Sequence, residues 1–317
     1  MNIPVLDLHC DTSFALLGEN LRTCGSMRQN ELHIDLERAS QLAGYAQFFA
    51  CFTTTPECEK YEIPPVELFE REMVTVLREL ERNSDLIAQA YTAEDIENNA
   101  AAGKMSAILS VEGPAGIGFD PELLQDLYQV GFRMSTLSWN EKNPLTGSHK
   151  TGGGLTDKGR EYVKECQRLG MIVDVSHISD EAFWDIIDIS GAPIVASHSN
   201  SRAVCPHSRN ITDEMFRAIC QTGGVVGLNQ YSAFVGQTED LPAVCKHVLH
   251  FLQMDPNAEH IALGADFDGC DKLPDGMNGI QDYPKLAHEL TKYGLSEDMI
   301  KNIFWNNAMG VIRKCCM

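Results

Sequence analysis

Short apolar runs alternate along the chain with longer stretches in which apolar residues recur at helical spacing. Eight of these runs are expected to form strands, at residues 3–9, 45–52, 105–113, 132–139, 171–177, 193–199, 223–230 and 260–269. Runs that are apolar throughout are typical of a parallel sheet, because helices cover both of its faces. Eight strand–helix repeats favour an α/β fold of the closed (β/α)8 TIM-barrel type over an open sheet.

The segments between these runs carry helix signals. Pro64 and Pro65 precede residues 66–83, where apolar side chains recur every three or four positions. Three further helices are expected to begin directly after capping side chains, those of Ser179, Thr212 and Ser296. The last of them is expected to run without a break over residues 297–312.

Length and composition are compatible with one large domain. The chain has 317 residues, and no low-complexity tract or Pro/Ser-rich linker divides it, so residues 1–317 are expected to form a single barrel domain. Acidic side chains number 45 against 25 basic ones, which gives a formal net charge of −20. That charge argues against nucleic acid or an anionic membrane as a partner.

The cysteine pattern bears on the cellular compartment. The eleven cysteines are an odd number, only Cys315 and Cys316 adjoin, and there is no CxxC pair, so free thiols in a reducing compartment are expected. The N-terminal residues do not resemble a signal peptide, and no apolar run approaches the roughly 18 residues of a membrane span. A cytoplasmic protein is therefore expected.

Polar residues occupy the ends of five of the expected strands. They are three histidines and four acids: His9, Asp11, Glu112, His177, His198, Asp266 and Asp268. A barrel gathers the C-terminal ends of its strands around one mouth, where its active site lies. Each residue alone has an ordinary explanation as a turn, cap or surface residue. Their shared position favours a metal site, because neutral imidazoles and carboxylates suit zinc, and also manganese or cobalt.

The motifs that contain these residues also carry a family resemblance. In order along the chain they are DLHCDT, AQFFA, SVEG, DVSH, SHSNSRAVCPHSRN and GADFDG. Together they resemble the membrane (renal) dipeptidase family, the M19 zinc peptidases among the amidohydrolase-like barrels, and the similarity spans nearly the whole chain. Barrel hydrolases with an HxH motif and a carbamylated lysine match less well, because the first strand carries HxD and Glu112 is the natural bridge.

The resemblance implies two zinc ions per chain and a cofactor-dependent hydrolysis of dipeptides. It places His9 and Asp11 on the first ion and His177 and His198 on the second, with Glu112 as a ligand of both and part of the catalytic centre. A hydroxide that bridges the ions would attack the peptide bond.

Substrate binding is assigned in the same way. The resemblance implies that Arg209 binds the free carboxylate of the substrate and that Asp266 contacts the substrate and carries the proton. It also allows D-residues at the C-terminal position, and a homodimer, because family members often form dimers. Asp268 is left as a supporting or structural residue.

One position departs from the family pattern. Mammalian members have a substrate-binding histidine where this chain has Trp139 in TLSWNEKNP, so Trp139 is the residue expected to face the substrate there. Asn140 or His149 could take over the histidine's role in orienting the carbonyl. Two other readings stay open: a binuclear-metal hydrolase that acts on lactams or other cyclic amides, and a non-catalytic metal-binding homologue.

Overall fold

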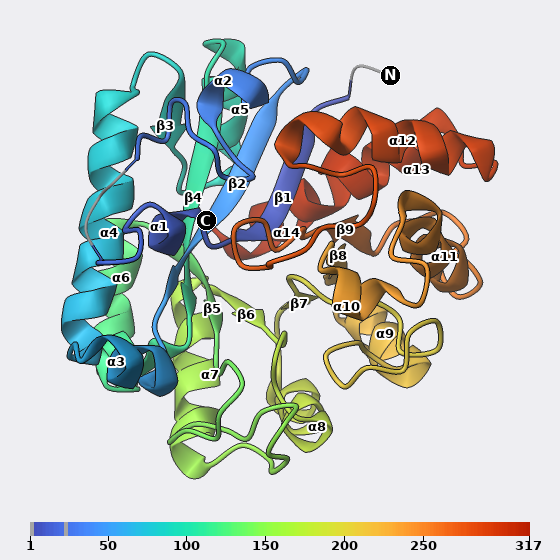
Figure 1. Cartoon of the computed structure of the whole chain (residues 1–317). Coiled ribbons are helices and arrows are strands. Elements are labelled where there is room, and N and C mark those ends of the chain that lie inside the picture. The colour runs from blue at the N-terminus through green and yellow to red at the C-terminus, as the bar shows by residue number, and fades with distance from the viewer. Residues whose placement is uncertain (1–2, 22–24) are drawn as a thin grey trace.

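Parallel strands form the centre of the molecule in the computed structural model, which describes residues 3–21 and 25–317. Their order is β2-β1-β9-β8-β7-β6-β5-β4-β3, and an additional pairing of β2 with β4 closes eight of them into a barrel. Figure 1 shows the helices arranged around this ring of strands. The bounds are β1 Val5–Cys10, β2 Tyr45–Phe52, β3 Ile87–Gln89, β4 Met105–Glu112, β5 Phe132–Thr136, β6 Ile172–Asp174, β7 Ile194–Ala196, β8 Val225–Leu228 and β9 Ile261–Leu263.

All eight expected strands are present, and the expected (β/α)8 barrel is confirmed. The sequence did not predict β3, a strand of three residues that pairs only with the first residues of β4, from Ile87↔Met105 to Gln89↔Ala107. Strand β5 pairs with β4 further along, from Leu109 onward. Thus β3 flanks the N-terminal half of β4 and is an addition to the barrel wall.

Eleven α-helices of five or more residues are found in the described part of the chain. They are α3 Thr55–Tyr61, α4 Pro65–Arg82, α5 Ala93–Ala101, α6 Leu124–Val130, α7 Asp157–Leu169, α8 Asp180–Ile189, α9 Asp213–Thr222, α11 Leu241–Phe251, α12 Tyr283–Lys292, α13 Glu297–Lys301 and α14 Asn307–Cys315. Short helices complete the loops: α1 Thr12–Ala15, α2 Leu36–Ala39, α10 Ser232–Val235, and the 3-10 turns η1 Pro114–Ile117, η2 Pro121–Leu123 and η3 Ile280–Asp282.

The three predicted N-terminal caps are confirmed. The side chains of Ser179, Thr212 and Ser296 accept hydrogen bonds from backbone N–H groups three residues further on. The single helix expected over residues 297–312 was wrong in one respect, because a π-helical turn, η4 Asn302–Asn306, separates α13 from α14.

Two layers of apolar side chains stabilise the barrel. One cluster fills its interior, where strand residues such as Leu8, Phe48 and Ile108 pack with Ile312 of α14. Asn307 donates to the carbonyl of Ile261 at the start of β9, so α14 closes the N-terminal end of the barrel.

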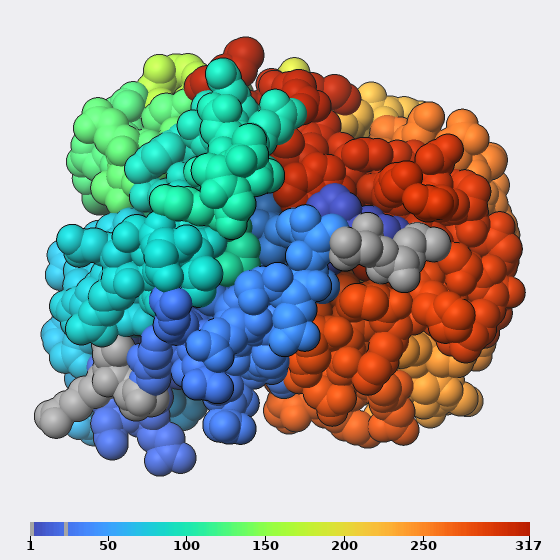
Figure 2. Space-filling view, turned by 90° about the horizontal axis from the view of Figure 1, so that it is seen from above, coloured from blue at the N-terminus to red at the C-terminus, as the bar shows by residue number. Residues whose placement is uncertain are grey.

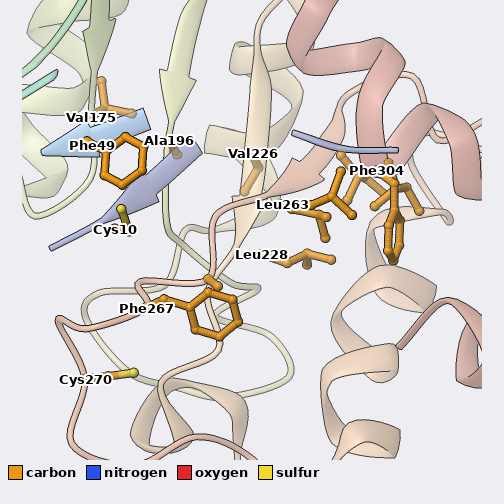
Figure 3. Packing of buried hydrophobic residues seen from close by; sticks show 14 of the residues in the cluster. Cys10, Phe49, Val175, Ala196, Val226, Leu228, Leu263, Phe267, Cys270 and Phe304 are labelled. Carbon is orange, nitrogen blue, oxygen red and sulfur yellow. The ribbon is translucent and has the colours of Figure 1, made fainter. Parts of the chain in front are cut away.

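The other cluster lies between the strands and the surrounding helices. Figure 3 shows part of it, with Leu228 of β8, Leu263 of β9 and Phe304 of η4. Figure 2 shows the N-terminal segments, coloured blue to green, lying against the C-terminal segments in orange and red.

The described residues also bear on membrane contact and thiol state. Over residues 3–21 and 25–317, no helix combines the length and apolar character that a bilayer span requires. The ten cysteines within these ranges are free thiols, as expected. Cys24 lies outside the described residues.

Candidate active site

Strands β1 and β4 bring the first group of acids and imidazole together. His9 lies in β1, Asp11 directly follows that strand, and Glu112 is the last residue of β4. His9 Nε2 lies 3.3 Å from Glu112 Oε2 and 3.6 Å from Asp11 Oδ2. All three side chains are buried. The HxD motif of β1 and the acid at the end of β4 therefore lie together, as the sequence predicted.

The second pair of histidines follows β6 and β7. His177 and His198 place their Nε2 atoms 2.9 Å apart, and these atoms lie 3.0 Å and 3.7 Å from Glu112 Oε1. The imidazole of His198 also stacks on that of His9, with ring centroids 3.9 Å apart. The carboxylate of Glu112 therefore faces His9 with one oxygen and both later histidines with the other.

Asp266 and Asp268 follow β9 but have different surroundings. Asp266 Oδ1 lies 3.9 Å from His9 Nε2, and its Oδ2 accepts a hydrogen bond from Asn229 Nδ2 at 3.2 Å. Asp268 instead accepts from Thr12 Oγ1 and from the backbone N–H of His33, both at 2.6 Å. These bonds give Asp268 a supporting position behind the site, whereas Asp266 faces the imidazole.

Burial controls the protonation of the site. It raises the pKa of Glu112 to about 7 and that of Asp266 to about 6. Burial also lowers the pKa of His177 and His198 well below the usual value. For His9, burial opposes the charged form, but the carboxylates of Glu112 and Asp11 raise its pKa well above the usual value. The neutral imidazoles of His177 and His198, beside the protonatable groups of His9 and Glu112, suit a cation, which would displace the protons.

The side-chain atoms in this cluster fit a metal centre. Within the described residues, both ring nitrogens of His9, Asp11 Oδ1 and Glu112 Oε1 are buried without a hydrogen-bond partner, an unusual state for buried polar atoms. Ligand atoms lie within 4.8 Å of one another in two sets, His9–Glu112–His198 and His9–Asp11–Asp266. Nitrogen and oxygen donors of this kind are those that zinc prefers.

The cluster opens into a cavity of about 540 Å³. Arg209 lines this cavity and is only 3% exposed. Its Nη2 donates to the carbonyl of His198 at 3.2 Å, its Nη1 lies 3.5 Å from Ser199 Oγ, and its Nε has no partner among the described residues. The guanidinium, 5.4 Å from the Phe234 ring centre, thus keeps donors free for an anionic group.

Trp139, the residue that differs from the family pattern, lines the cavity together with Asn140 and His149. The Trp139 ring packs edge-on against Phe52, with centroids 5.2 Å apart, and lies 6.3 Å from the His177 ring. Asn140 Oδ1 lies 2.7 Å from His149 Nε2 and 3.3 Å from His177 Nδ1. Both residues suggested as substitutes for the family histidine therefore lie near the site, and Asn140 contacts an expected metal ligand.

Sequence reasoning missed several polar residues behind the ligands. Asp174 and Ser197 are completely buried beneath His177 and His198, and Asn229 holds Asp266. The signal available was a charged residue inside the apolar run MIVDVSH, because a buried carboxylate needs hydrogen-bond donors around it.

Comparison with known protein families agrees with this geometry. The family described as Membrane dipeptidase (Peptidase family M19) matches residues 1–316. The chain belongs to this family. The resemblance inferred from the sequence motifs is therefore confirmed, and the chain is a dipeptidase of the M19 metallopeptidase family.

Individual relatives of this M19 chain have related names, and two solved structures share its fold. An uncharacterised dipeptidase of Schizosaccharomyces pombe is 35% identical over 214 residues, which cover 65% of this chain and 52% of that protein. A metallo peptidase of Rhodobacter sphaeroides, liganded with a phosphinate mimic of the dipeptide L-Ala-D-Ala, superposes with a TM-score of 0.89 at 27% identity, covering 99% of this chain and 100% of that one. The dipeptidase AC, an M19 metallo peptidase, superposes with a TM-score of 0.87 at 27% identity, covering 100% of this chain and 99% of that one.

Proposed function

We propose that this dipeptidase binds two zinc ions, one at His9 and Asp11 and the other at His177 and His198, with Glu112 as a ligand of both. The observation that carries the proposal is the position of the Glu112 carboxylate. Its Oε2 lies 3.3 Å from His9 Nε2 and its Oε1 lies 3.0 Å from His177 Nε2. A carboxylate placed in this way can serve two cations at once.

The proposed reaction divides the work between the ions and the protein. Two divalent cations, when bound, supply a water that is acidic near neutral pH and polarise the scissile carbonyl. Asp266 would accept a proton from the attacking water and return it to the leaving amine, as one group acting first as base and then as acid. Burial raises the pKa of Asp266 to about 6 in the metal-free protein. Asn229 holds its other oxygen in place.

Arg209 is proposed to select short substrates by binding their terminal carboxylate. A guanidinium matches a carboxylate with two parallel hydrogen bonds, and this one is buried in the wall of a cavity of about 540 Å³. The aromatic ring of Trp139 forms another part of that wall and is proposed to contact the substrate.

D-residues at the C-terminal position are also proposed as substrates. The Rhodobacter sphaeroides relative, which is bound to a mimic of L-Ala-D-Ala, supports this part of the proposal. The cytoplasmic location and the homodimer stay predictions from the sequence.

The carboxylate role of Arg209 can be tested with matched variants and substrates. Arg209→Met is expected to raise KM for a dipeptide about a hundredfold or more, because a buried charged contact is lost, while the zinc content stays that of the wild type. Arg209→Lys should retain part of the binding. The wild type should cleave L-Ala-D-Ala and L-Ala-L-Ala much faster than their C-terminal amides. Equal rates on acid and amide would contradict the assignment.

The same assay separates the dipeptidase from the other readings. Chelation should abolish dipeptide hydrolysis, and added zinc should restore it. Faster turnover of a cyclic amide than of any dipeptide would favour the lactam hydrolase. Full zinc content without hydrolysis of either substrate would favour a non-catalytic homologue.

A further inference from the structure

Asp174, the last residue of β6, is a buried carboxylate surrounded by donors. Its Oδ1 accepts from the backbone N–H groups of Ser176 at 2.9 Å and Ser197 at 2.8 Å. Its Oδ2 lies 2.6 Å from Ser197 Oγ and 2.5 Å from Thr136 Oγ1. These four contacts join β5, β6 and the residues after β7 beneath the candidate metal centre.

The contacts of Ser197 fix the direction of its hydroxyl. Ser197 Oγ lies 2.6 Å from Asp174 Oδ2 and 2.7 Å from His198 Nδ1, with Ser176 Oγ further away at 3.3 Å. A hydroxyl has one proton, and carboxylate oxygens only accept. Because this proton is donated to Asp174, the Ser197 oxygen must accept from His198, which places the imidazole proton on Nδ1.

We propose that Asp174 is a positioning residue that acts through Ser197 to hold His198 in the tautomer with a lone pair on Nε2. The inference rests on the proposed function, in which His198 is a zinc ligand through that nitrogen. Nε2 lies 2.9 Å from His177 Nε2 and 3.7 Å from Glu112 Oε1, within the ligand cluster.

A nearly isosteric variant should reverse this chain of hydrogen bonds. In Asp174→Asn, the amide oxygen must stay at the Oδ1 position, because two backbone N–H groups point to it. The amide NH2 then faces Ser197 and donates to its oxygen. The Ser197 proton turns toward His198 Nδ1, which is nearer than Ser176 Oγ, and the imidazole proton moves to Nε2, where it competes with metal binding.

The tautomer can be read directly in the metal-free protein. Histidine labelled with 15N distinguishes the two tautomers by the chemical shifts of the ring nitrogens, and His198→Gln assigns the signal. The wild type should carry the proton on Nδ1 and Asp174→Asn on Nε2. Thr136→Val is the matched control, since it also removes one hydrogen bond to Asp174 Oδ2 but leaves the link to His198 unchanged.

Zinc affinity supplies a second readout, by competition of zinc alone with a chromophoric chelator. Asp174→Asn and Ser197→Ala should weaken zinc binding about 10–100-fold, whereas Ser197→Thr and Thr136→Val should stay near the wild type. The proposal is overturned if His198 in Asp174→Asn keeps its proton on Nδ1 with an affinity equal to that of Thr136→Val. If Asp174→Asn does not fold, equal affinities of Ser197→Ala and Ser197→Thr overturn it.

Failure of the proposed function gives a different result. A wild type that binds no zinc, or binds it without hydrolysing dipeptides, contradicts the dipeptidase mechanism. The tautomer of His198 is measured without zinc and is independent of that outcome.

Discussion

At the scale of single residues, the candidate ligands lie at the ends of barrel strands, and polar groups on neighbouring segments hold them in place. His9, Glu112 and His198 could be predicted because they end apolar runs, and a barrel gathers such positions at one mouth. The hydrogen bond from Asn229 to Asp266 could not be predicted, since it joins loops whose paths depend on tertiary packing. His177 and Asp266 also have positive φ angles of 68° and 63°, a strained backbone that is common at functional sites.

The role of Glu112 can be tested by removing its charge. Glu112→Gln should reduce bound zinc below the wild-type content, because an amide is a poor substitute for a carboxylate that serves two cations, and dipeptide hydrolysis should fall at least a hundredfold. Elemental analysis after dialysis measures the metal. Glu79→Gln is the control, since Glu79 is also a buried glutamate but lies on α4, away from the site, where it accepts from the backbone N–H of Met27 and from Arg82. Equal zinc content in both variants would contradict the assignment.

His247 gives the fold a pH dependence that is separate from the site. This buried side chain accepts from the N–H of Ser201 and donates to the carbonyl of Val235, and burial lowers its pKa to about 4. The stability that it contributes is complete above pH ~6.5, where the imidazole is neutral in both states. As the pH falls from ~6.5 to about 4, only the unfolded chain takes up the proton. This lowers the free energy of unfolding by about 3 kcal/mol.

Urea unfolding of the chelated protein between pH 7.5 and pH 5 measures this effect. The free energy of unfolding should fall more steeply toward pH 5 in the wild type than in His247→Gln, which has no titrating group at position 247. The same slope in both proteins would show that His247 contributes nothing to it.

At the scale of elements, the regular parts of the fold were predictable and their ends were not. The strands expected at 171–177 and 260–269 end at Asp174 and Leu263, because the following residues leave the ladder to aim their side chains into the site. Strand β3 was missed because three residues are too few to form a recognisable apolar run in the sequence. The π turn Asn302–Asn306 was missed because its apolar spacing continues that of the flanking helices.

The closing role of α14 leads to a stability prediction. Ile312 is a buried member of the apolar cluster that contains Leu8 and Phe48, so Ile312→Ala should lower the free energy of unfolding by about 2–5 kcal/mol. Lys314→Ala replaces an exposed residue of the same helix and should change the free energy of unfolding by less than about 0.5 kcal/mol. Denaturant titration compares the two, and equal effects would mean that α14 does not fill the barrel.

At the scale of the whole molecule, the closed barrel brings together ligands that are up to 189 residues apart, from His9 to His198. The sequence was sufficient to predict this closure, because eight similar repeats have few other arrangements. It could not give the size of the cavity, which depends on how the loops pack above the strands. Metal ions held by residues from four strands or strand ends would join the two halves of the chain.

Zinc should therefore stabilise the entire fold. The melting temperature of the chelated protein should rise with added zinc in a concentration-dependent way, because only the folded chain brings these ligands together. Magnesium at the same concentration should have a much smaller effect, since it prefers an octahedral set of oxygen ligands. Calorimetry measures both, and an unchanged melting temperature with zinc would indicate that the cluster holds no ion.

The most direct test of the central claim is a titration of the chelated protein with zinc, followed by the rate of L-Ala-D-Ala hydrolysis. The account predicts that the rate rises from zero and becomes constant at two ions per chain. A rate that becomes constant at one ion per chain, or the absence of hydrolysis at any zinc concentration, would contradict it.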